Sequence, residues 1–244
     1  MGAHKPLHLS NTAFFDICLG WKGICVEPSS TFDEFAGIRS CSMAKHCMWS
    51  RTEPLRMLFR SEGDASLIID EKEQQRIHKL QPEVAKRIFE CNGISALDLF
   101  DRFNARDKHG NEVSLKSDIP EQKIPIDFIS LDVEGAEAEV LKCFPFDKYD
   151  VKVWTIEVNR NELGIDEIML AHGYVKDYHL TFFQSRLDAV YVKRPAPMQV
   201  PWQTHEEWLQ WKKGKENTFK NRKPRIHFTS KVGILTCNIS TNSS

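Results

Sequence analysis

Short apolar runs alternate with amphipathic stretches along most of this chain. Runs of strand character fall at residues 21–26, 42–49, 55–60, 84–89, 126–131 and 151–158. Between them, apolar residues recur at helical spacing at 11–19, 31–38, 94–103, 164–172 and in a stretch that starts at Ala136. Two last apolar runs, 174–180 and 189–193, are separated by a polar turn region and predict an antiparallel pair. The pattern predicts an α/β fold with a Rossmann-like sheet and an antiparallel terminal hairpin.

The character of the sequence changes after Pro195. Trp202, Trp208 and Trp211 lie in a predicted short helix, and Glu216 is the only acid between residues 212 and 231, where basic residues dominate. We therefore expect one domain at 1–194, followed by a tryptophan-containing segment and a basic, flexible tail at 195–244.

The segment 124–141 is the most informative part of the sequence. Its strand-like run ends abruptly on Asp132, Glu134 and Gly135, and a helical stripe begins at Ala136. Ligands of open parallel sheets bind outside the carboxyl ends of the strands. The segment therefore predicts one edge of a ligand crevice, with Asp132 holding a cationic centre or accepting a hydroxyl proton. The alternative is that one of the two acids caps the following helix, which suits Glu134 better.

Two other acidic positions follow predicted strands. Glu27 ends the run 21–26 and could accept both hydroxyls of a ribose, or it could be an exposed turn residue. Glu157 and Asn159 end the run 151–158 and should emerge beside Asp132. Such oxygens could hold a hard divalent cation, but a hydrogen-bond network around the same loops is the interpretation we favour, so no metal is expected.

Composition narrows the class of protein. The formal net charge of −1 over 244 residues provides no general attraction to nucleic acid, so no nucleic-acid partner is expected. The seven cysteines form no Cys-x-x-Cys pair, which favours reduced core thiols over disulfides or a zinc site. No secretory signal is visible and no apolar stretch approaches the roughly 18 residues of a membrane span. We therefore expect a cytoplasmic protein.

Three stretches together resemble the FkbM-type methyltransferase family: Gly2-Ala-His with His8-Leu-Ser-Asn-Thr12, Leu19-Gly-Trp-Lys-Gly-Ile-Cys-Val-Glu-Pro28, and Asp127-Phe-Ile-Ser-Leu-Asp-Val-Glu-Gly-Ala-Glu-Ala-Glu-Val-Leu141. The closing hairpin up to Val192 is similar to that family's last hairpin, so the resemblance covers roughly residues 2–194. It implies a class I S-adenosylmethionine fold and methyl transfer to a hydroxyl, often of a sugar or another small molecule.

The resemblance also implies roles for individual residues. Glu27 matches the acid that holds the cofactor ribose, and Gly2 and Asn11 match positions near the cofactor. Asp132 and Glu134 match the acidic motif that faces the cofactor methyl group and the acceptor. Glu157, beside them, completes the set of candidate catalytic residues.

The chain departs from the family pattern at its start. The family's first strand, which enters an Asp-x-Gly loop, is missing, and Lys5 and Pro6 stand where Asp and Gly would be. The expected sheet therefore lacks a central strand. Two readings follow: an O-methyltransferase that uses S-adenosylmethionine, or a catalytically defective remnant of that fold acting as a binding module. A nicotinamide enzyme is disfavoured because no Gly-x-Gly-x-x-Gly follows a strand.

Overall fold

The computed structural model describes residues 1–8, 10–59, 66–68, 70–116, 122–158, 162–177, 188–193, 226–231 and 234–239. The chain divides into two compact units, 1–195 and 196–244. In the second unit, β13 (Ile226–Lys231) and β14 (Ile234–Ile239) form an antiparallel hairpin. The predicted helix around Trp202, Trp208 and Trp211 lies outside the described residues.

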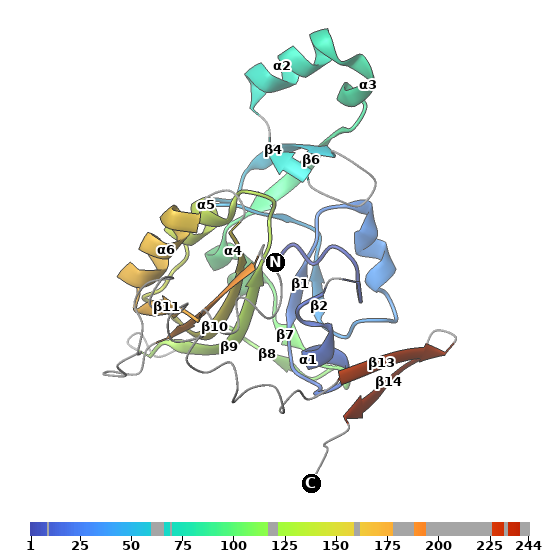
Figure 1. Cartoon of the computed structure of the whole chain (residues 1–244), viewed down its shortest axis with the longest axis vertical. Helices are drawn as coiled ribbons and strands as arrows, with labels where there is room; N and C mark the ends of the chain where they lie inside the picture. Colours follow the sequence, from blue (N-terminus) through green and yellow to red (C-terminus); the bar gives the residue numbers. More distant parts are fainter. Residues whose placement is uncertain are drawn as a thin grey trace, which may run out of the picture. The chain divides into compact units, whose positions relative to one another are not determined.

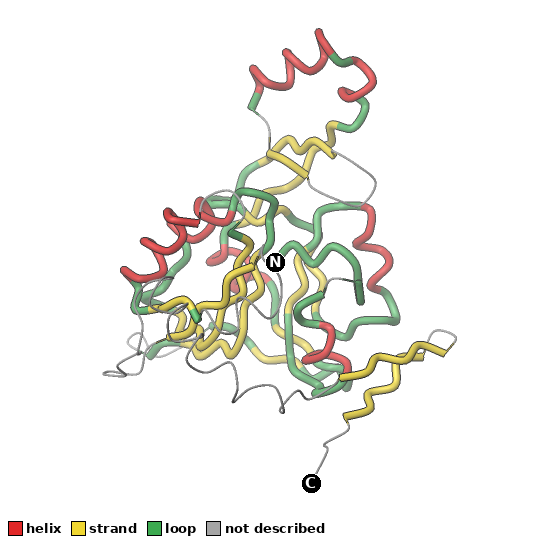
Figure 2. Tube along the Cα trace, viewed as in Figure 1, coloured by secondary structure: helices red, strands yellow, loops and turns green. Residues whose placement is uncertain are grey.

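A four-stranded sheet forms the centre of the first unit (Figure 1). Its order is β11 (Tyr174–Lys176), β12 (Asp188–Lys193), β10 (Tyr149–Glu157) and β9 (Ile124–Leu131). β9 and β10 are parallel, and β12 runs antiparallel to both β10 and β11. The pairing of β11 with β12 confirms the predicted antiparallel pair. The helices that follow the two parallel strands, α5 (Glu137–Lys142) and α6 (Glu162–Ala171), lie side by side (Figures 1 and 2).

The main core lies where this sheet meets its helices. Trp154 of β10 is fully buried and makes an edge-to-face contact with Phe144, with ring centroids 4.8 Å apart. Leu131, Ile156 and Met169 are also fully buried in the same cluster. Near-continuous burial is typical of a strand covered on both faces, and β10 shows it over most of its length.

A second, two-stranded sheet contains β1, the strand that precedes Glu27 of the predicted crevice. β1 (Ile24–Val26) pairs in parallel with β2 (Ser42–Ala44), and neither strand pairs with the four-stranded sheet. The expectation of one Rossmann-like sheet is therefore only partly right, because the described strands form several small sheets. The discontinuity falls between β1 and β9, next to the chain start (Figure 1).

The remaining strands form two further sheets. One has the order β3 (Cys47–Met48), β6 (Ile88–Ile94), β4 (Pro54–Phe59), β5 (Ser66–Ile68), and the other pairs β7 (Ala105–Arg106) with β8 (Glu112–Val113). The strand predicted at 84–89 is wrong in its first half: α3 (Pro82–Ala85) is helical and β6 begins only at Ile88. Pro82 at the first helical position explains the helix, because its fixed φ suits a helix start.

The remaining helices are short. They are α1 (Ala13–Ile17), the 3₁₀ helix η1 (Ser30–Phe35), α2 (Glu71–Leu80) and α4 (Ala96–Arg102). Ser95 caps α4, since its side chain accepts a hydrogen bond from the backbone N–H of Asp98. In the part of the chain that the structure describes, no helix is long and apolar enough to cross a membrane.

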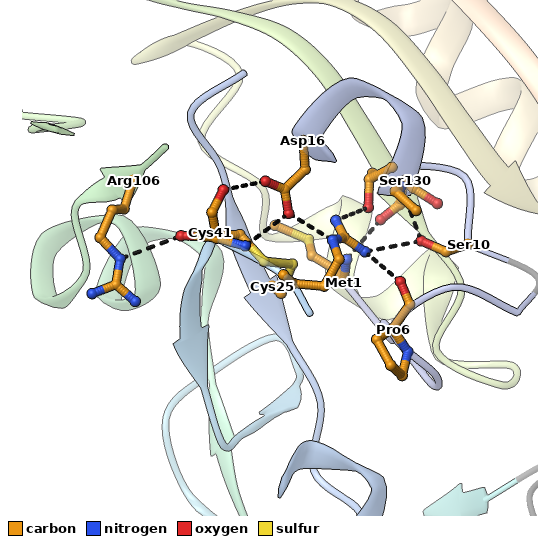
Figure 3. The surroundings of a disulfide bond; sticks show 12 residues. Met1, Pro6, Ser10, Asp16, Cys25, Cys41, Arg106 and Ser130 are labelled. Carbon is orange, nitrogen blue, oxygen red and sulfur yellow. Dashed lines mark hydrogen bonds and ion pairs between the residues drawn. A yellow bond between two sulfur atoms is a disulfide. The ribbon is translucent and has the colours of Figure 1, made fainter. Parts of the chain in front are cut away.

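The expectation of reduced cysteines is wrong. Cys25 of β1 is bonded to Cys41 just before β2 (Figure 3). Cys47 of β3 is bonded to Cys91 of β6, so each disulfide ties neighbouring strands together. Cys18 is also disulfide-bonded, and Cys143 is free and exposed. No Cys-x-x-Cys pattern marks these disulfides, because their partners are 16 and 44 residues apart along the chain. The cytoplasmic location stays a prediction, but reduced thiols no longer support it.

Candidate functional site

Three carboxylates meet at the carboxyl ends of β9 and β10. Asp132 follows the last residue of β9, and Glu157 is the last residue of β10. Since Leu131 and Ile156 are register partners, the two acids emerge next to each other, as the sequence predicted. Glu137, the first residue of α5, joins them: one carboxylate oxygen from each of Asp132, Glu137 and Glu157 lies within 4.8 Å of the others.

Crowding and burial make Asp132 and Glu157 hard to ionise. Burial raises the pKa of Asp132 to about 7, and the negative charges of Glu134, Asp188 and Glu137 add to the effect. Burial likewise raises the pKa of Glu157 to about 8, with Asp132 and Glu137 as the nearest like charges. The cluster therefore retains protons near neutral pH and would be stabilised by a cation.

Stability is expected to fall as the pH rises from about 5 to about 9. Unfolded Asp and Glu lose their protons near pH 4, whereas folded Asp132 and Glu157 keep theirs up to about 7 and about 8. Between these limits the folded state binds more protons than the unfolded state, so the free energy of unfolding decreases with rising pH. Urea denaturation at pH 5.5, 7 and 8.5 measures the slope. In Glu157→Gln the slope should become shallower, and an unchanged slope would contradict the assignment.

Glu137 shapes the loop that presents Asp132. Its carboxylate accepts hydrogen bonds from the backbone N–H groups of Val133 (2.8 Å) and Gly135 (3.1 Å) and is almost fully buried. The sequence had offered Asp132 or Glu134 as the cap of the following helix, but the N-cap residue of α5 is Ala136, which makes no side-chain cap hydrogen bond. Glu134 instead adopts a left-handed backbone conformation (φ 61°), which is strained for a side chain other than glycine.

The first three residues join the two sheets. The amino group of Met1 donates to the carbonyl oxygen of Ser130 (2.8 Å), and the N–H of Asp132 donates to the carbonyl oxygen of Met1 (3.1 Å). On the other side, the N–H groups of Gly2 and Ala3 donate to the carbonyl oxygen of Val26, at 3.0 and 2.9 Å. These residues therefore bridge the carboxyl ends of β1 and β9.

Gly2→Ala is expected to lower the free energy of unfolding by about 1–3 kcal/mol. Gly2 has φ +73°, and an added Cβ would lie 1.6 Å from the carbonyl oxygen of Asp132, so the backbone must shift. Hydrogen exchange should show faster exchange at the Asp132 amide. Gly37→Ala is the matched control, because Gly37 has φ +76° and open space around it. If both variants behave alike, close packing at Gly2 is not the cause.

Glu27 is buried, and both of its carboxylate oxygens accept hydrogen bonds from the backbone. One carboxylate oxygen accepts from the backbone N–H of His4 (2.6 Å) and the other from that of Ser29 (2.9 Å). A carboxylate has about four acceptor positions, so two remain for further donors. The exposed-turn alternative is therefore wrong, while the ribose role stays a prediction. Asn11 lies elsewhere, beside β9, where its side-chain amide donates to the hydroxyl of Ser130 (3.2 Å).

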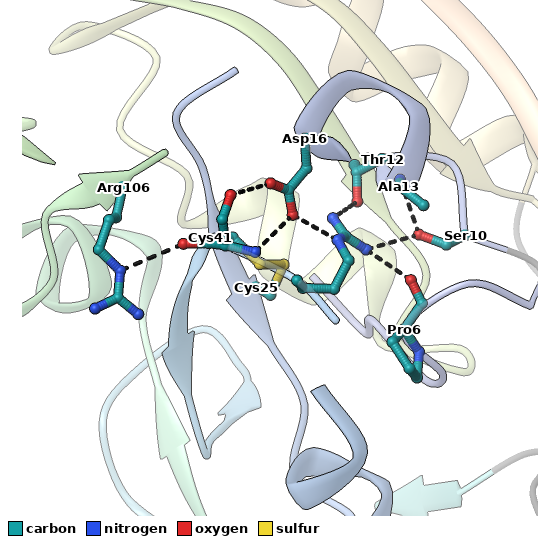
Figure 4. Close-up of polar contacts among 10 residues, drawn as sticks. Pro6, Ser10, Thr12, Ala13, Asp16, Cys25, Cys41 and Arg106 are labelled. Atoms are coloured by element: carbon teal, nitrogen blue, oxygen red, sulfur yellow. Dashed lines mark hydrogen bonds and ion pairs between the residues drawn. A yellow bond between two sulfur atoms is a disulfide. The ribbon is translucent and has the colours of Figure 1, made fainter. Parts of the chain in front are cut away.

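A buried arginine holds the loop before α1, and sequence reasoning missed it. The guanidinium of Arg39 donates to Asp16 at 2.6 Å, and both side chains are almost inaccessible to water. It also donates to the carbonyl oxygen of Pro6 (3.1 Å) and to the hydroxyls of Ser10 (3.1 Å) and Thr12 (3.0 Å). Figure 4 shows these polar groups converging from separate segments. A single Arg between two predicted elements carries no local signal of this role.

A cavity of about 440 Å³ lies between the two sheets. Its lining includes Ile24 and Cys25 of β1, Ile126 and Phe128 of β9, and Met1 at the chain start. The cavity thus lies alongside β1 and β9, and Met1, Gly2 and Ala3 line one end of it. Asp132 is the only member of the acidic cluster that lines it.

The cluster Asp132, Glu137 and Glu157 has the oxygen ligands that a metal ion requires. Only two of the three are residues that the sequence singled out, and Asn159 lies outside the described residues. The expectation that no metal binds stays a prediction.

Parallel strands that end in neighbouring acids, each followed by a helix, define an α/β protein with a ligand site at its sheet edge. The family model described as the methyltransferase FkbM domain matches residues 1–176, so the chain belongs to the FkbM methyltransferase family. That membership makes it an S-adenosylmethionine-dependent methyltransferase. No curated protein and no solved structure matches the chain.

Proposed function

We propose that this methyltransferase transfers the methyl group to a hydroxyl of a small molecule or a glycan. The observation that supports it most is the position of Asp132: a half-buried carboxylate at the end of β9, with its pKa raised to about 7, within the residues that the family model matches. A base whose pKa lies near the working pH is suited to accept a hydroxyl proton.

The residues at the sheet edge fit the cofactor. When bound, S-adenosylmethionine supplies an electrophilic methyl group on a positively charged sulfur. The carboxylates of Asp132 and Glu134 provide negative charge that favours such a cation, and the charge of Glu134 is one of the causes that raise the pKa of Asp132. Glu27 has acceptor positions left for the ribose hydroxyls. Gly2 allows the backbone of the first residues to lie close to the backbone of Asp132, because a side chain at Gly2 would collide with the carbonyl oxygen of Asp132.

In this mechanism the protein mainly positions groups and accepts a proton. Asp132, held by the backbone bond to Met1 and by the loop that Glu137 closes, would orient the acceptor hydroxyl and take its proton. Glu157, with the higher pKa, would stay protonated at neutral pH and leave Asp132 as the base. Fixing the acceptor oxygen in line with the transferred methyl group supplies much of the rate.

Binding of the demethylated cofactor, S-adenosylhomocysteine, tests the proposal. Isothermal titration calorimetry of the 244-residue chain should show saturable binding at one site per chain. Glu27→Gln should weaken it roughly tenfold or more, because a charge-assisted hydrogen bond to the ribose is lost. Glu34→Gln, at an exposed acid of the neighbouring helix η1, is the matched control and should bind as the parent does. Unchanged binding in Glu27→Gln would remove Glu27 from the site.

The second candidate is a binding module with the methyltransferase fold and no turnover. It is supported by the two backbone N–H groups that already occupy both oxygens of Glu27, and by the break in the sheet beside Met1. S-adenosylhomocysteine binding without methyl transfer to any of a panel of sugars and small alcohols would favour this candidate. Release of labelled product from one such acceptor would exclude it.

A further inference from the structure

A second cavity, of about 460 Å³, lies where the parallel strands of the four-stranded sheet begin, at the opposite end from the acidic cluster. β10 starts at Tyr149, just after Asp147 of this cavity, and ends at Glu157 of the cluster, so the two sites are roughly 26 Å apart along the strand. The two cavities share no described lining residue. The lining of the second cavity includes Lys123, Phe146, Asp147, His172, Tyr174 and Lys193.

Aromatic rings give the second cavity a rigid wall. Phe146 and Tyr174 are buried, and the hydroxyl of Tyr174 donates to the carbonyl oxygen of Val151 (2.7 Å). The ring of His172 lies nearly parallel to that of Phe146, with centroids 3.9 Å apart. His172 is exposed whereas Phe146 is buried, so the stack ends on the imidazole ring. The face of such a ring is electron-rich and attracts the C–H bonds on the face of a sugar ring.

Two lysine ammonium groups also line the second cavity. Lys123 donates to the carbonyl oxygen of Phe146 (2.8 Å), and within the described ranges no carboxylate pairs with it. Lys193 pairs with Asp150, and its ammonium lies 5.9 Å from the centre of the Tyr174 ring. Each ammonium has three N–H groups, so donors remain on both lysines. Lysines with free donors are suited to bind the oxygens of a phosphate group.

A carboxylate completes the lining. Asp147 is exposed, and no residue in the part of the chain that the structure describes forms a hydrogen bond or ion pair with its side chain. An ionised carboxylate has about four acceptor positions, enough to receive two neighbouring sugar hydroxyls. Inorganic phosphate would be repelled by Asp147, and a neutral sugar would leave the lysine donors unused. A ligand with both hydroxyls and a phosphate matches all the groups.

We propose that the second cavity binds a sugar that carries one phosphate group. Lys123 and Lys193 donate to the phosphate oxygens, and Asp147 accepts hydrogen bonds from sugar hydroxyls. One face of the sugar ring stacks on His172. A volume of about 460 Å³ is within the roughly 300–1,000 Å³ of small-molecule sites. The cavity is separate from the acidic cluster, so the proposal does not depend on methyl transfer.

Isothermal titration calorimetry of the 244-residue chain tests this, with glucose 6-phosphate and ribose 5-phosphate as the probes. At least one of the two should bind at one site per chain with a Kd of about 0.1–1 mM. Glucose, ribose and inorganic phosphate should each bind at least about tenfold more weakly, because each makes only part of the contacts. No binding of either sugar phosphate, or equally tight binding of inorganic phosphate, would overturn the proposal.

Two substitutions identify the cavity as the site. Lys123→Met should weaken sugar phosphate binding about tenfold, because a charge-assisted hydrogen bond is lost. Asp147→Asn should weaken it about fivefold without weakening the binding of inorganic phosphate, since only the sugar contacts depend on that carboxylate. The matched control is Lys152→Met, because Lys152 is an exposed lysine of β10 that pairs with Asp127 outside the cavity.

The control should bind the sugar phosphate as the parent does. An equal loss in Lys152→Met and Lys123→Met would show a general charge effect and overturn the proposal. Asp147→Asn keeps the test decisive if Lys123→Met does not fold, because the Asp147 side chain is exposed and its replacement leaves the described packing intact. Unchanged sugar phosphate binding in Asp147→Asn would also reject the proposed site.

Discussion

Replacing Arg39 with methionine is expected to lower the free energy of unfolding by about 3–5 kcal/mol. The substitution keeps an unbranched side chain but leaves the carboxylate of Asp16 buried without its cation. It also removes the donors to Pro6, Ser10 and Thr12, which fix the loop before α1. Breaking one partner of a buried ion pair is among the most destabilising single changes, since the remaining charge cannot reach water. Urea denaturation at pH 7 measures the loss.

An exposed ion pair provides the comparison. Arg51→Met removes a partner of Glu53, but the Arg51 side chain is 74% exposed, so the loss should stay below about 1 kcal/mol. The double variant Arg39→Met with Asp16→Leu should recover part of the lost stability, because neither buried charge remains. A loss below about 1 kcal/mol for Arg39→Met alone would show that water reaches Asp16 and that the network does not hold the loop.

Asp132→Asn is expected to reduce methyl transfer by about 10²–10⁴-fold. Asparagine has a similar shape but cannot accept a proton, so only the proposed base is removed. In the parent protein the rate should rise as the pH passes about 7, where Asp132 loses its proton, and the variant should lack this rise. The variant should be at least as stable as the parent at pH 8.5, because an ionised, half-buried Asp132 among other acids is then no longer present. Steady-state rates from pH 5.5 to 9 and urea denaturation measure the two effects.

Asp127→Asn is the matched control for this substitution. Asp127 lies on β9, the strand that Asp132 follows, but it is exposed and pairs with Lys152 at the surface, so its loss should leave the rate unchanged. Equal rates for Asp132→Asn and the parent would contradict a base role for Asp132. A loss of rate together with a loss of stability at pH 8.5 would indicate a structural role for Asp132.

The sequence pattern predicted correctly those strands, caps and turns that are determined by residues close together along the chain. The apolar run ending at Asp132 became β9, Ser95 became the cap of α4, and the last two apolar runs became the antiparallel pair β11 and β12. The prediction was wrong where a nearby residue favoured a different conformation from the one that the apolar run predicts. Val84 is apolar, but Pro82 starts a helical turn around it and delays β6 until Ile88.

The candidate site was predicted in part for the same reason. Asp132 and Glu157 were found because strand ends can be read from the sequence, and adjacent parallel strands bring their ends together. Glu137 was missed because its partners are backbone N–H groups of a loop whose turn no residue pattern specifies. The partners of Glu27 were not predictable either, since His4 lies 23 residues away.

The sequence by itself determined the family, the strand that presents Asp132 and the antiparallel order at the sheet edge, because these depend on side-chain pattern and on neighbours close along the chain. Tertiary structure alone decided that Arg39 pairs with Asp16, that Cys25 pairs with Cys41 and that β1 and β9 face one cavity across Met1. Each of these depends on which distant segments meet. A charged or thiol side chain carries the capacity to form such a contact, but only the folded backbone brings its partner within reach.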